Sequence, residues 1–134
     1  FKISGFKFAR SVKMLLVGRF PDAKPQEQCT RLGEGVAIKI MDSSVICDYR
    51  MVEFMKSVAT GKKIKWQPEI LRAGGTDTAS LQRMTPGGSI AGAVSLPTRH
   101  IHQVIEMCHK KDIADAIKLL AACVCELDKH DWSF

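Results

Sequence analysis

Arg72-Ala73-Gly74-Gly75-Thr76-Asp77-Thr78 and, about twenty residues later, Ser95-Leu96-Pro97-Thr98-Arg99-His100-Ile101-His102 are the two stretches around which the chain is organised. Each follows an apolar run that is typical of a β-strand, so each is expected to form the loop after a strand. Loops at the carboxyl ends of strands hold the ligands and reactive groups of α/β proteins. The sequence therefore predicts that both stretches lie at one edge of a sheet, held there by the other residues.

Short apolar runs alternate with helical patterns around the two stretches. The runs predict strands at residues 14–17, 36–41, 64–71 and 90–96. Pro68 interrupts the third run and indicates an edge position or a bulge, because proline cannot donate a hydrogen bond to a neighbouring strand. The order of strands and helices predicts an α/β fold, a layered sheet with flanking helices.

Three helices are predicted from capping residues and apolar spacing. The caps are Asp48 for the first helix, which Gly61 closes, Thr76 or Asp77 for a short second helix that ends near Met84, and Asp112 for the last. The apolar face of the last helix is predicted to contain Ile113, Ile117, Leu120, Val124 and Leu127, with Ala116 and Ala121 beside it.

Composition places the chain among single globular domains. It has 134 residues, of which 46% are hydrophobic and 25% charged, with a formal net charge of +6. No apolar run approaches the roughly 20 residues of a membrane span. The lysines and arginines are scattered and do not interleave with the nine aromatic residues as a stacking platform for nucleic acid would. We therefore expect neither a membrane nor a nucleic-acid partner.

Five cysteines form neither a Cys-x-x-Cys pair nor an even disulfide framework. They are interpreted as reduced, mostly buried thiols of a cytoplasmic protein. Cys123 and Cys125 are two residues apart in a predicted helix and therefore point to nearly opposite faces. Phe1 stands where a complete chain has methionine, and residues 1–17 lack the features of a signal peptide, so a piece of a longer chain is expected.

The two stretches contain the residue types that could bind a ligand. Gly74 and Gly75 let the backbone approach a ligand closely, but a tight strand-to-helix turn with a capping acid explains residues 74–77 more simply. His100 and His102 would face the same side of an extended segment and could chelate a metal, or could be hydrogen-bonded surface histidines. Thr98 and Arg99 could fix a substrate group or anchor the loop.

These motifs, in this order, resemble a family of metallo-aminopeptidases. The matching pieces are Leu-Gly-x-Gly with Ile-Lys-Ile (32–40), Asp-Ser-Ser (42–44), Gly-Gly-Thr-Asp (74–77), and residues 95–102 with Glu106. The family includes the glutamyl and deblocking aminopeptidases, whose members form tetrahedral dodecamers. The resemblance covers about residues 24–129, and it implies that residues 24–134 are the C-terminal portion of a phosphorylase/hydrolase-like catalytic domain, whereas residues 1–23 match poorly.

The resemblance also implies a chemistry. Family members hold two divalent metal ions, zinc or cobalt, and a metal-held water attacks the first peptide bond while a Glu acts as general base. His102 falls on the final metal-ligand histidine, whereas His100 stands where the family usually has Tyr. Gly74, Gly75, Thr76 and Asp77 would line the substrate cleft, together with Thr98 and Arg99.

Several family residues have no counterpart in this chain. The first His-x-Asp, the bridging Asp and the Glu-Glu pair belong upstream of it, and the inserted barrel-like domain is absent. A further ligand Asp belongs near residues 15–18, where no acid stands, and Asp22 is a poor substitute. The resemblance predicts a metal-dependent aminopeptidase that releases N-terminal residues from peptides as a homo-oligomer, present here as a fragment inactive alone. The alternative is a non-catalytic α/β binding or assembly module, and a basic nucleic-acid binder ranks last.

Overall fold

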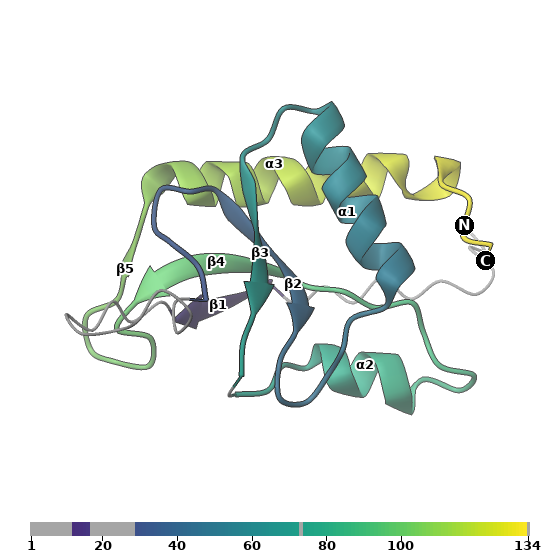
Figure 1. Ribbon diagram of the computed structural model, residues 1–134, viewed down its shortest axis with the longest axis horizontal. Coiled ribbons are helices and arrows are strands. Elements are labelled where there is room, and N and C mark those ends of the chain that lie inside the picture. Colours follow the sequence, from purple (N-terminus) through teal and green to yellow (C-terminus); the bar gives the residue numbers. More distant parts are fainter. Residues whose placement is uncertain (1–11, 17–28, 73, 134) are drawn as a thin grey trace.

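The computed structural model describes residues 12–16, 29–72 and 74–133 (Figure 1). These residues form a mixed α/β fold, as predicted. The elements are β1 (Val12–Leu16), β2 (Val36–Met41), α1 (Tyr49–Gly61), β3 (Trp66–Ile70), α2 (Thr78–Met84), β4 (Val94–Arg99), β5 (Met107–Cys108), α3 (Lys110–Glu126) and a 3-10 turn (Leu127–Lys129). The strands form one sheet in the order β1-β4-β2-β3, with β5 beside β4.

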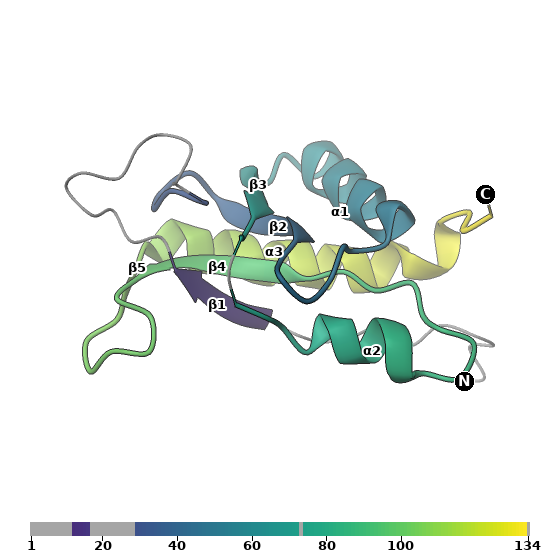
Figure 2. The same cartoon turned by 60° about the horizontal axis from the view of Figure 1, so that its bottom comes forward.

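Helices α1 and α3 pack against each other and against the sheet (Figure 1). The apolar core lies between them and one face of the sheet, and it includes Val36 and Ile38 of β2, Met55 of α1 and Leu119 of α3. Helix α2 lies apart from this layer, beyond the ends of β2 and β3 (Figure 2). The layered sheet with flanking helices is therefore confirmed.

The strands of the sheet run in two directions. β2 and β3 are parallel, β1 and β4 are parallel, and β4 is antiparallel to β2, with Ile38 opposite Val94. The carboxyl ends of β3 and β4 therefore point in opposite directions, and the loops that follow them leave the sheet at opposite ends of its strands. The prediction that residues 72–78 and 95–102 share one edge is therefore wrong, because an isolated apolar run does not reveal the direction in which its strand pairs.

The two stretches are also far apart along β4. The carbonyl of Ala93 accepts a hydrogen bond from the backbone N–H of Lys39, near the edge that residues 74–77 occupy. From Ala93 to Arg99 the chain advances six residues, about 20 Å at the rise of an extended strand. Residues 74–77 therefore lie toward the start of β4, and the hairpin after Arg99 lies toward its end.

Strand positions agree with the sequence in three cases out of four. β2 has the predicted bounds, and β1 contains residues 14–16 of the first predicted strand, whose last residue, Val17, lies outside the described residues. β3 is at the sheet edge, which is one of the two alternatives that Pro68 indicated; its register with β2 shifts between Lys39 and Met41, beyond the regular pair of Pro68 with Ile38. The strand predicted at residues 90–96 is instead Val94–Arg99.

The shift of β4 has a tertiary cause. Thr98 and Arg99 have loop-like composition, but Thr98 pairs with Leu16 of β1 on one side and with Cys108 of β5 on the other. Pairing on both sides overrides the local preference of the residues for a loop.

Helix α1 begins as predicted, since the Asp48 carboxylate accepts a hydrogen bond from the backbone N–H of Arg50 at 2.9 Å. Its predicted C-cap is wrong: Gly61 is the last helical residue, and the left-handed turn is made by Lys63, with φ of 55°. Asp77 occupies the N-cap position of α2, but among the described residues its side chain accepts no capping hydrogen bond.

The cap predicted for the last helix is also wrong. His109 caps α3, and its Nδ1 accepts from the backbone N–H of Lys111 at 3.3 Å. Asp112 is fully buried and its two carboxylate oxygens accept from the backbone N–H groups of Gly33 and Gly35, at 2.7 and 3.0 Å. The acid that resembles a local cap therefore ties α3 to the Gly-x-Gly loop before β2.

Helix α3 buries a face that overlaps only in part with the one predicted: Ala116 is buried, and Leu120 and Leu127 pack against the core. Its buried residues are Asp112, Ala116, Leu119 and Cys123. Ile117 is 63% exposed and Val124 is 52% exposed, whereas Leu119 is 0% exposed. The sequence has apolar residues around most of this helix, so spacing alone did not separate the exposed residues from the buried ones.

The thiols are less buried than expected. Cys47 and Cys123 are buried, and burial raises the pKa of the first to about 11 and of the second to about 12. Cys108 and Cys125 are exposed, so Cys123 and Cys125 do lie on different faces of α3. Among the helices that the structure describes, none is long and apolar enough to cross a bilayer.

Candidate functional site

The histidine-containing stretch is the turn of a β-hairpin. β4 and β5 pair antiparallel, with Thr98 opposite Cys108 and Arg99 opposite Met107, so residues 100–106 form the connection. Ile101 is buried and anchors this turn, whereas His102 is exposed. The hairpin therefore presents His102 at the carboxyl end of β4.

The backbone of this turn separates the two histidines. His100 and His102 have φ of 59° and 60°, the left-handed region that non-glycine residues rarely adopt. The backbone N–H of His102 donates to Glu106 Oε1 at 2.7 Å, and that of Gln103 donates to the carbonyl of His100 at 3.0 Å. Because the segment is not extended, the reason given for a two-histidine chelate is wrong.

The carboxyl end of β1 lies beside this hairpin. The parallel register places Leu15 opposite Pro97 and Leu16 opposite Thr98. Leu15 and Leu16, the described part of the segment where the resemblance expects a ligand Asp, therefore lie in the strand adjacent to the one that ends before His102. Val17, Gly18 and Asp22 lie outside the described residues.

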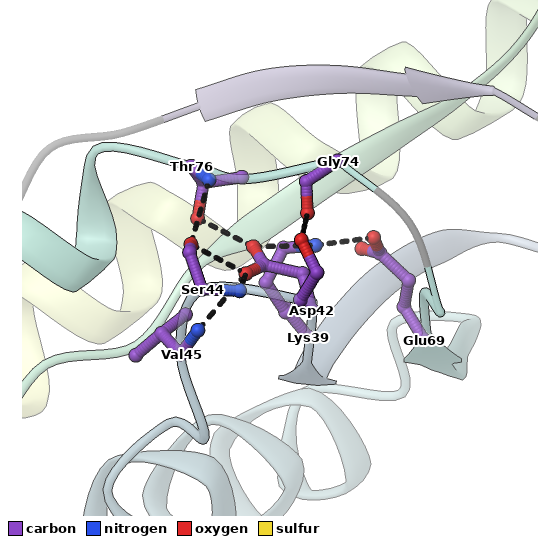
Figure 3. Close-up of polar contacts among 8 residues, drawn as sticks. Lys39, Asp42, Ser44, Val45, Glu69, Gly74 and Thr76 are labelled. Carbon is purple, nitrogen blue, oxygen red and sulfur yellow. Dashed lines mark hydrogen bonds and ion pairs between the residues drawn. The ribbon is translucent and has the colours of Figure 1, made fainter.

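Residues 74–77 lie at the opposite end of the sheet from His102, where hydrogen bonds from the residues that follow β2 hold them (Figure 3). Asp42 Oδ2 accepts from the Thr76 hydroxyl at 2.8 Å, and Asp42 Oδ1 accepts from the Ser44 N–H and hydroxyl and from the Val45 N–H. The Gly74 carbonyl accepts from the Ser43 hydroxyl at 2.6 Å and from the Ser43 N–H at 3.1 Å. Thr76 is buried, whereas Gly74, Gly75 and Asp77 are exposed.

The pKa of Asp42 reflects this environment. Burial acts to raise the pKa, but hydrogen bonds from Ser44 and Thr76, with the charge of Lys39, outweigh burial and hold the pKa below its ordinary value. The carboxylate is therefore charged at neutral pH.

Sequence reasoning missed Lys39 and Glu69, which lie beside Asp42. The Lys39 ammonium pairs with Glu69 Oε1 at 2.5 Å and lies 3.6 Å from Asp42 Oδ2, and all three side chains are fully buried. A lysine inside the apolar run of residues 36–41 was the available signal, since a buried charge requires a partner. The sequence did not show which acid would be that partner.

A dinuclear metal centre does not fit the described residues by themselves. Among them, no group of three or more His, Cys, Asp and Glu side chains is close enough to hold a metal ion. Glu106 lies next to His102, because its Oε1 accepts a hydrogen bond from the His102 backbone N–H. The described residues thus offer one candidate ligand, His102.

Comparison with protein families gives the decisive result. Residues 6–119 match the family described as M42 glutamyl aminopeptidase. The chain belongs to the M42 glutamyl aminopeptidase family. The match covers most of the chain and includes the hairpin with His102 and residues 74–77, which confirms the resemblance seen in the motifs.

Individual M42 relatives support this assignment. An Acetivibrio thermocellus protein named "Putative aminopeptidase" is 38% identical over 117 residues, which cover 87% of this chain and 34% of the relative. An aminopeptidase structure from the archaeon Desulfurococcus kamchatkensis has 32% identity and a TM-score of 0.77, covering 81% of this chain and 31% of that one. A TET aminopeptidase structure from a Thaumarchaeota archaeon has 30% identity and a TM-score of 0.75, covering 84% and 30%. The chain spans about a third of the length of these relatives.

Proposed function

We propose that this chain is the C-terminal part of the catalytic domain of a metal-dependent aminopeptidase that releases N-terminal residues from peptides. Residues 24–134 would form that part. Within an M42 chain, the supporting observation is the position of His102, on a hairpin where the carboxyl ends of β1 and β4 lie side by side. Adjacent carboxyl ends of parallel strands are where α/β proteins bind ligands.

The proposal gives each predicted site residue a role. His102 binds one of two divalent metal ions, zinc or cobalt. Thr98 and Arg99, at the end of β4, are placed to hold the hairpin or a substrate group next to it. Residues 74–77 contact the substrate only if the cleft extends along β4, because they lie toward its start and His102 follows its end, about 20 Å of extended strand from Ala93 to Arg99.

The isolated chain is expected to be inactive. Catalytic zinc sites normally use about three protein ligands, and the described residues offer one. A single exposed histidine cannot hold a metal in a defined geometry or exclude competing ligands.

The proposal extends to assembly and location. A solved structure of the relative PhTET1 is described as a dodecamer, with 28% identity and a TM-score of 0.64, covering 71% of this chain and 28% of that one. We propose that the complete protein is likewise a homo-oligomer of the dodecameric kind, located in the cytoplasm, where peptides are its substrates.

Two histidine variants of the full-length protein test the function. His102→Ala should abolish hydrolysis of an aminoacyl anilide and lower the bound metal measured by mass spectrometry. His100→Ala, on the same turn with the same backbone conformation, is the matched control and should retain both. Activity and metal content unchanged in His102→Ala would exclude His102 as a ligand.

A non-catalytic module is the second candidate, and the absence of any acid at residues 15–18 favours it. It predicts that the full-length protein binds no metal stoichiometrically and hydrolyses no aminoacyl anilide with zinc or cobalt added. Metal-dependent hydrolysis by the wild type excludes this candidate.

A further inference from the structure

Three charged side chains are buried beneath an exposed turn. Lys39 and Glu69 are each 0% exposed and Asp42 is 3% exposed, and they lie where β2 and β3 end. Gly74 and Thr76 of the turn lie next to Asp42 and Ser44 (Figure 3), and Gly74, Gly75 and Asp77 are exposed. The exposed turn is thus bonded to buried charged residues, through the contact of Thr76 with Asp42.

The two carboxylate oxygens of Asp42 have different hydrogen-bond partners. Oδ1 accepts from the turn that follows its own strand, at the N–H and hydroxyl of Ser44 and the N–H of Val45. Oδ2 accepts from the Thr76 hydroxyl at 2.8 Å and faces the Lys39 ammonium at 3.6 Å. Asp42 therefore links the charge of Lys39 to a residue 34 positions later, through one oxygen atom.

A second connection holds the same turn. Ser43 donates both its hydroxyl and its N–H to the carbonyl of Gly74, and the N–H of Thr76 donates to the Ser44 hydroxyl at 3.3 Å. The turn is consequently held on both sides of Gly75.

Stability alone does not account for this arrangement. Replacing a buried ion pair by apolar groups of similar volume is often neutral or stabilising, because desolvation offsets the Coulomb attraction. Glu69 Oε2 is buried and, among the described residues, has no hydrogen-bond partner, which adds a further cost. What such a network does supply is one fixed geometry.

We propose that Lys39, Asp42 and Glu69 are positioning residues that hold residues 74–77 in the conformation needed to contact substrate. Thr76 is the buried contact through which they act, and Gly74, Gly75 and Asp77 are the exposed surface that they orient. This inference rests on the proposed assignment of residues 74–77 to the substrate cleft.

Thr76→Val in the full-length protein is the first variant, since it keeps the shape of the side chain and removes the bond to Asp42. Thr78→Val is the matched control: Thr78 is also buried, two residues later, and its hydroxyl has no partner among the described residues. Thr76→Ser keeps a hydroxyl and is the rescue variant.

Hydrogen exchange read by mass spectrometry on peptides that contain residues 74–77 should be at least about fivefold faster in Thr76→Val, given the usual strength of a hydrogen bond to a charged group. Thr78→Val and Thr76→Ser should match the wild type.

Lys39→Met tests the charged residue, with Lys56→Met as its control. Lys56 also pairs with a glutamate, Glu53 at 2.7 Å, but on the surface of α1. Faster exchange at residues 74–77 in Lys39→Met alone supports the proposal, and equal exchange in the two variants overturns it. If Lys39→Met does not fold, the comparison of Thr76→Val with Thr78→Val decides.

Kinetics separate this inference from the proposed function. In an active full-length enzyme, Thr76→Val should raise KM for a peptide about tenfold and leave kcat within about twofold, because binding contacts act equally on substrate and transition state. Unchanged KM with faster exchange overturns the positioning role and leaves the peptidase proposal intact. A wild-type full-length protein without activity overturns the peptidase proposal and, with it, the substrate contact of residues 74–77. In that case the rate of hydrogen exchange still reports whether the buried residues hold the turn.

Discussion

At the residue scale, breaking the ion pair between Lys39 and Glu69 is expected to have a large effect on stability. Both side chains are fully buried, so neither can be solvated when its partner is removed. A pair in this position is costly to break even though it adds little net stability. The equivalent pair on α1, Lys56 with Glu53, remains in contact with solvent.

Glu69→Ala should therefore lower the free energy of unfolding by about 3–5 kcal/mol, because it leaves the Lys39 ammonium buried without its closest carboxylate. Glu53→Ala should change it by no more than about 0.5 kcal/mol, as for other exposed helical pairs. Urea denaturation of both variants gives the two values. Equal losses would show that the Lys39 ammonium reaches solvent.

The pH dependence of stability should reveal Asp42. Its folded-state pKa is lowered, so its contribution is fully present above the ordinary Asp pKa of about 3.9 and is lost as pH falls through the folded value. The stability difference between wild type and Asp42→Asn should be constant from about pH 7 to pH 5 and shrink below about pH 4. Urea unfolding at each pH measures it, and other titrating groups occur in both proteins and cancel. A difference that persists unchanged at pH 3 would contradict the assigned pKa.

Residue roles were the hardest to predict from sequence. The family motif predicts His102 as a metal ligand, and this role stays a prediction; the structure shows that His102 is exposed on a hairpin. Asp112 was interpreted as a helix cap because a cap depends only on neighbouring residues, whereas its true partners, Gly33 and Gly35, are distant in the chain. Contacts between residues remote in sequence leave no local signal.

At the element scale, the glycines of the Gly-x-Gly loop and of α1 have opposite requirements. Gly35 has φ of 94°, and a Cβ there would lie 2.2 Å from the carbonyl oxygen of Lys65. Gly61 is the last residue of α1, and a Cβ there would meet nothing within 4 Å. The first position tolerates only glycine, and the second would benefit from a better helix former.

Gly35→Ala should accordingly lower the free energy of unfolding by at least about 2 kcal/mol, whereas Gly61→Ala should raise it by up to about 1 kcal/mol. Thermal unfolding followed by circular dichroism compares the two variants. Stabilisation by Gly35→Ala would mean that the approach of this loop to β3 is described wrongly.

The buried face of α3 gives a second prediction at this scale. Leu119 is fully buried in the core and Ile117 is 63% exposed, so Leu119→Ala should cost about 2–5 kcal/mol and Ile117→Ala less than about 1 kcal/mol. Denaturant midpoints of the two variants test this difference. A larger loss of stability in Ile117→Ala than in Leu119→Ala would support the buried face predicted from sequence.

Elements were predicted better than their contacts. The composition of residues 36–41 and the cap at Asp48 act locally, and β2 and the start of α1 appear where expected. The start of β4 and the buried face of α3 depend on what packs against them; the first prediction was wrong and the second was right only in part. The direction of β4 relative to β2, which separates the two stretches, is likewise a tertiary property.

At the scale of the whole molecule, the chain is an M42 family member that spans about a third of its relatives' length. One candidate metal ligand lies on the β4–β5 hairpin, and the described residues do not complete a metal site. The account therefore holds that metal binding and hydrolysis belong to the complete protein and not to this part.

Zinc stoichiometry and aminoacyl anilide hydrolysis, measured side by side on residues 1–134 and on the full-length protein, test this claim most directly. We predict two zinc ions per chain and metal-dependent hydrolysis for the full-length protein, with at most one weakly bound ion and no hydrolysis for residues 1–134. Two tightly bound ions with hydrolysis by residues 1–134, or hydrolysis by the full-length protein after its metal has been removed, would contradict the account.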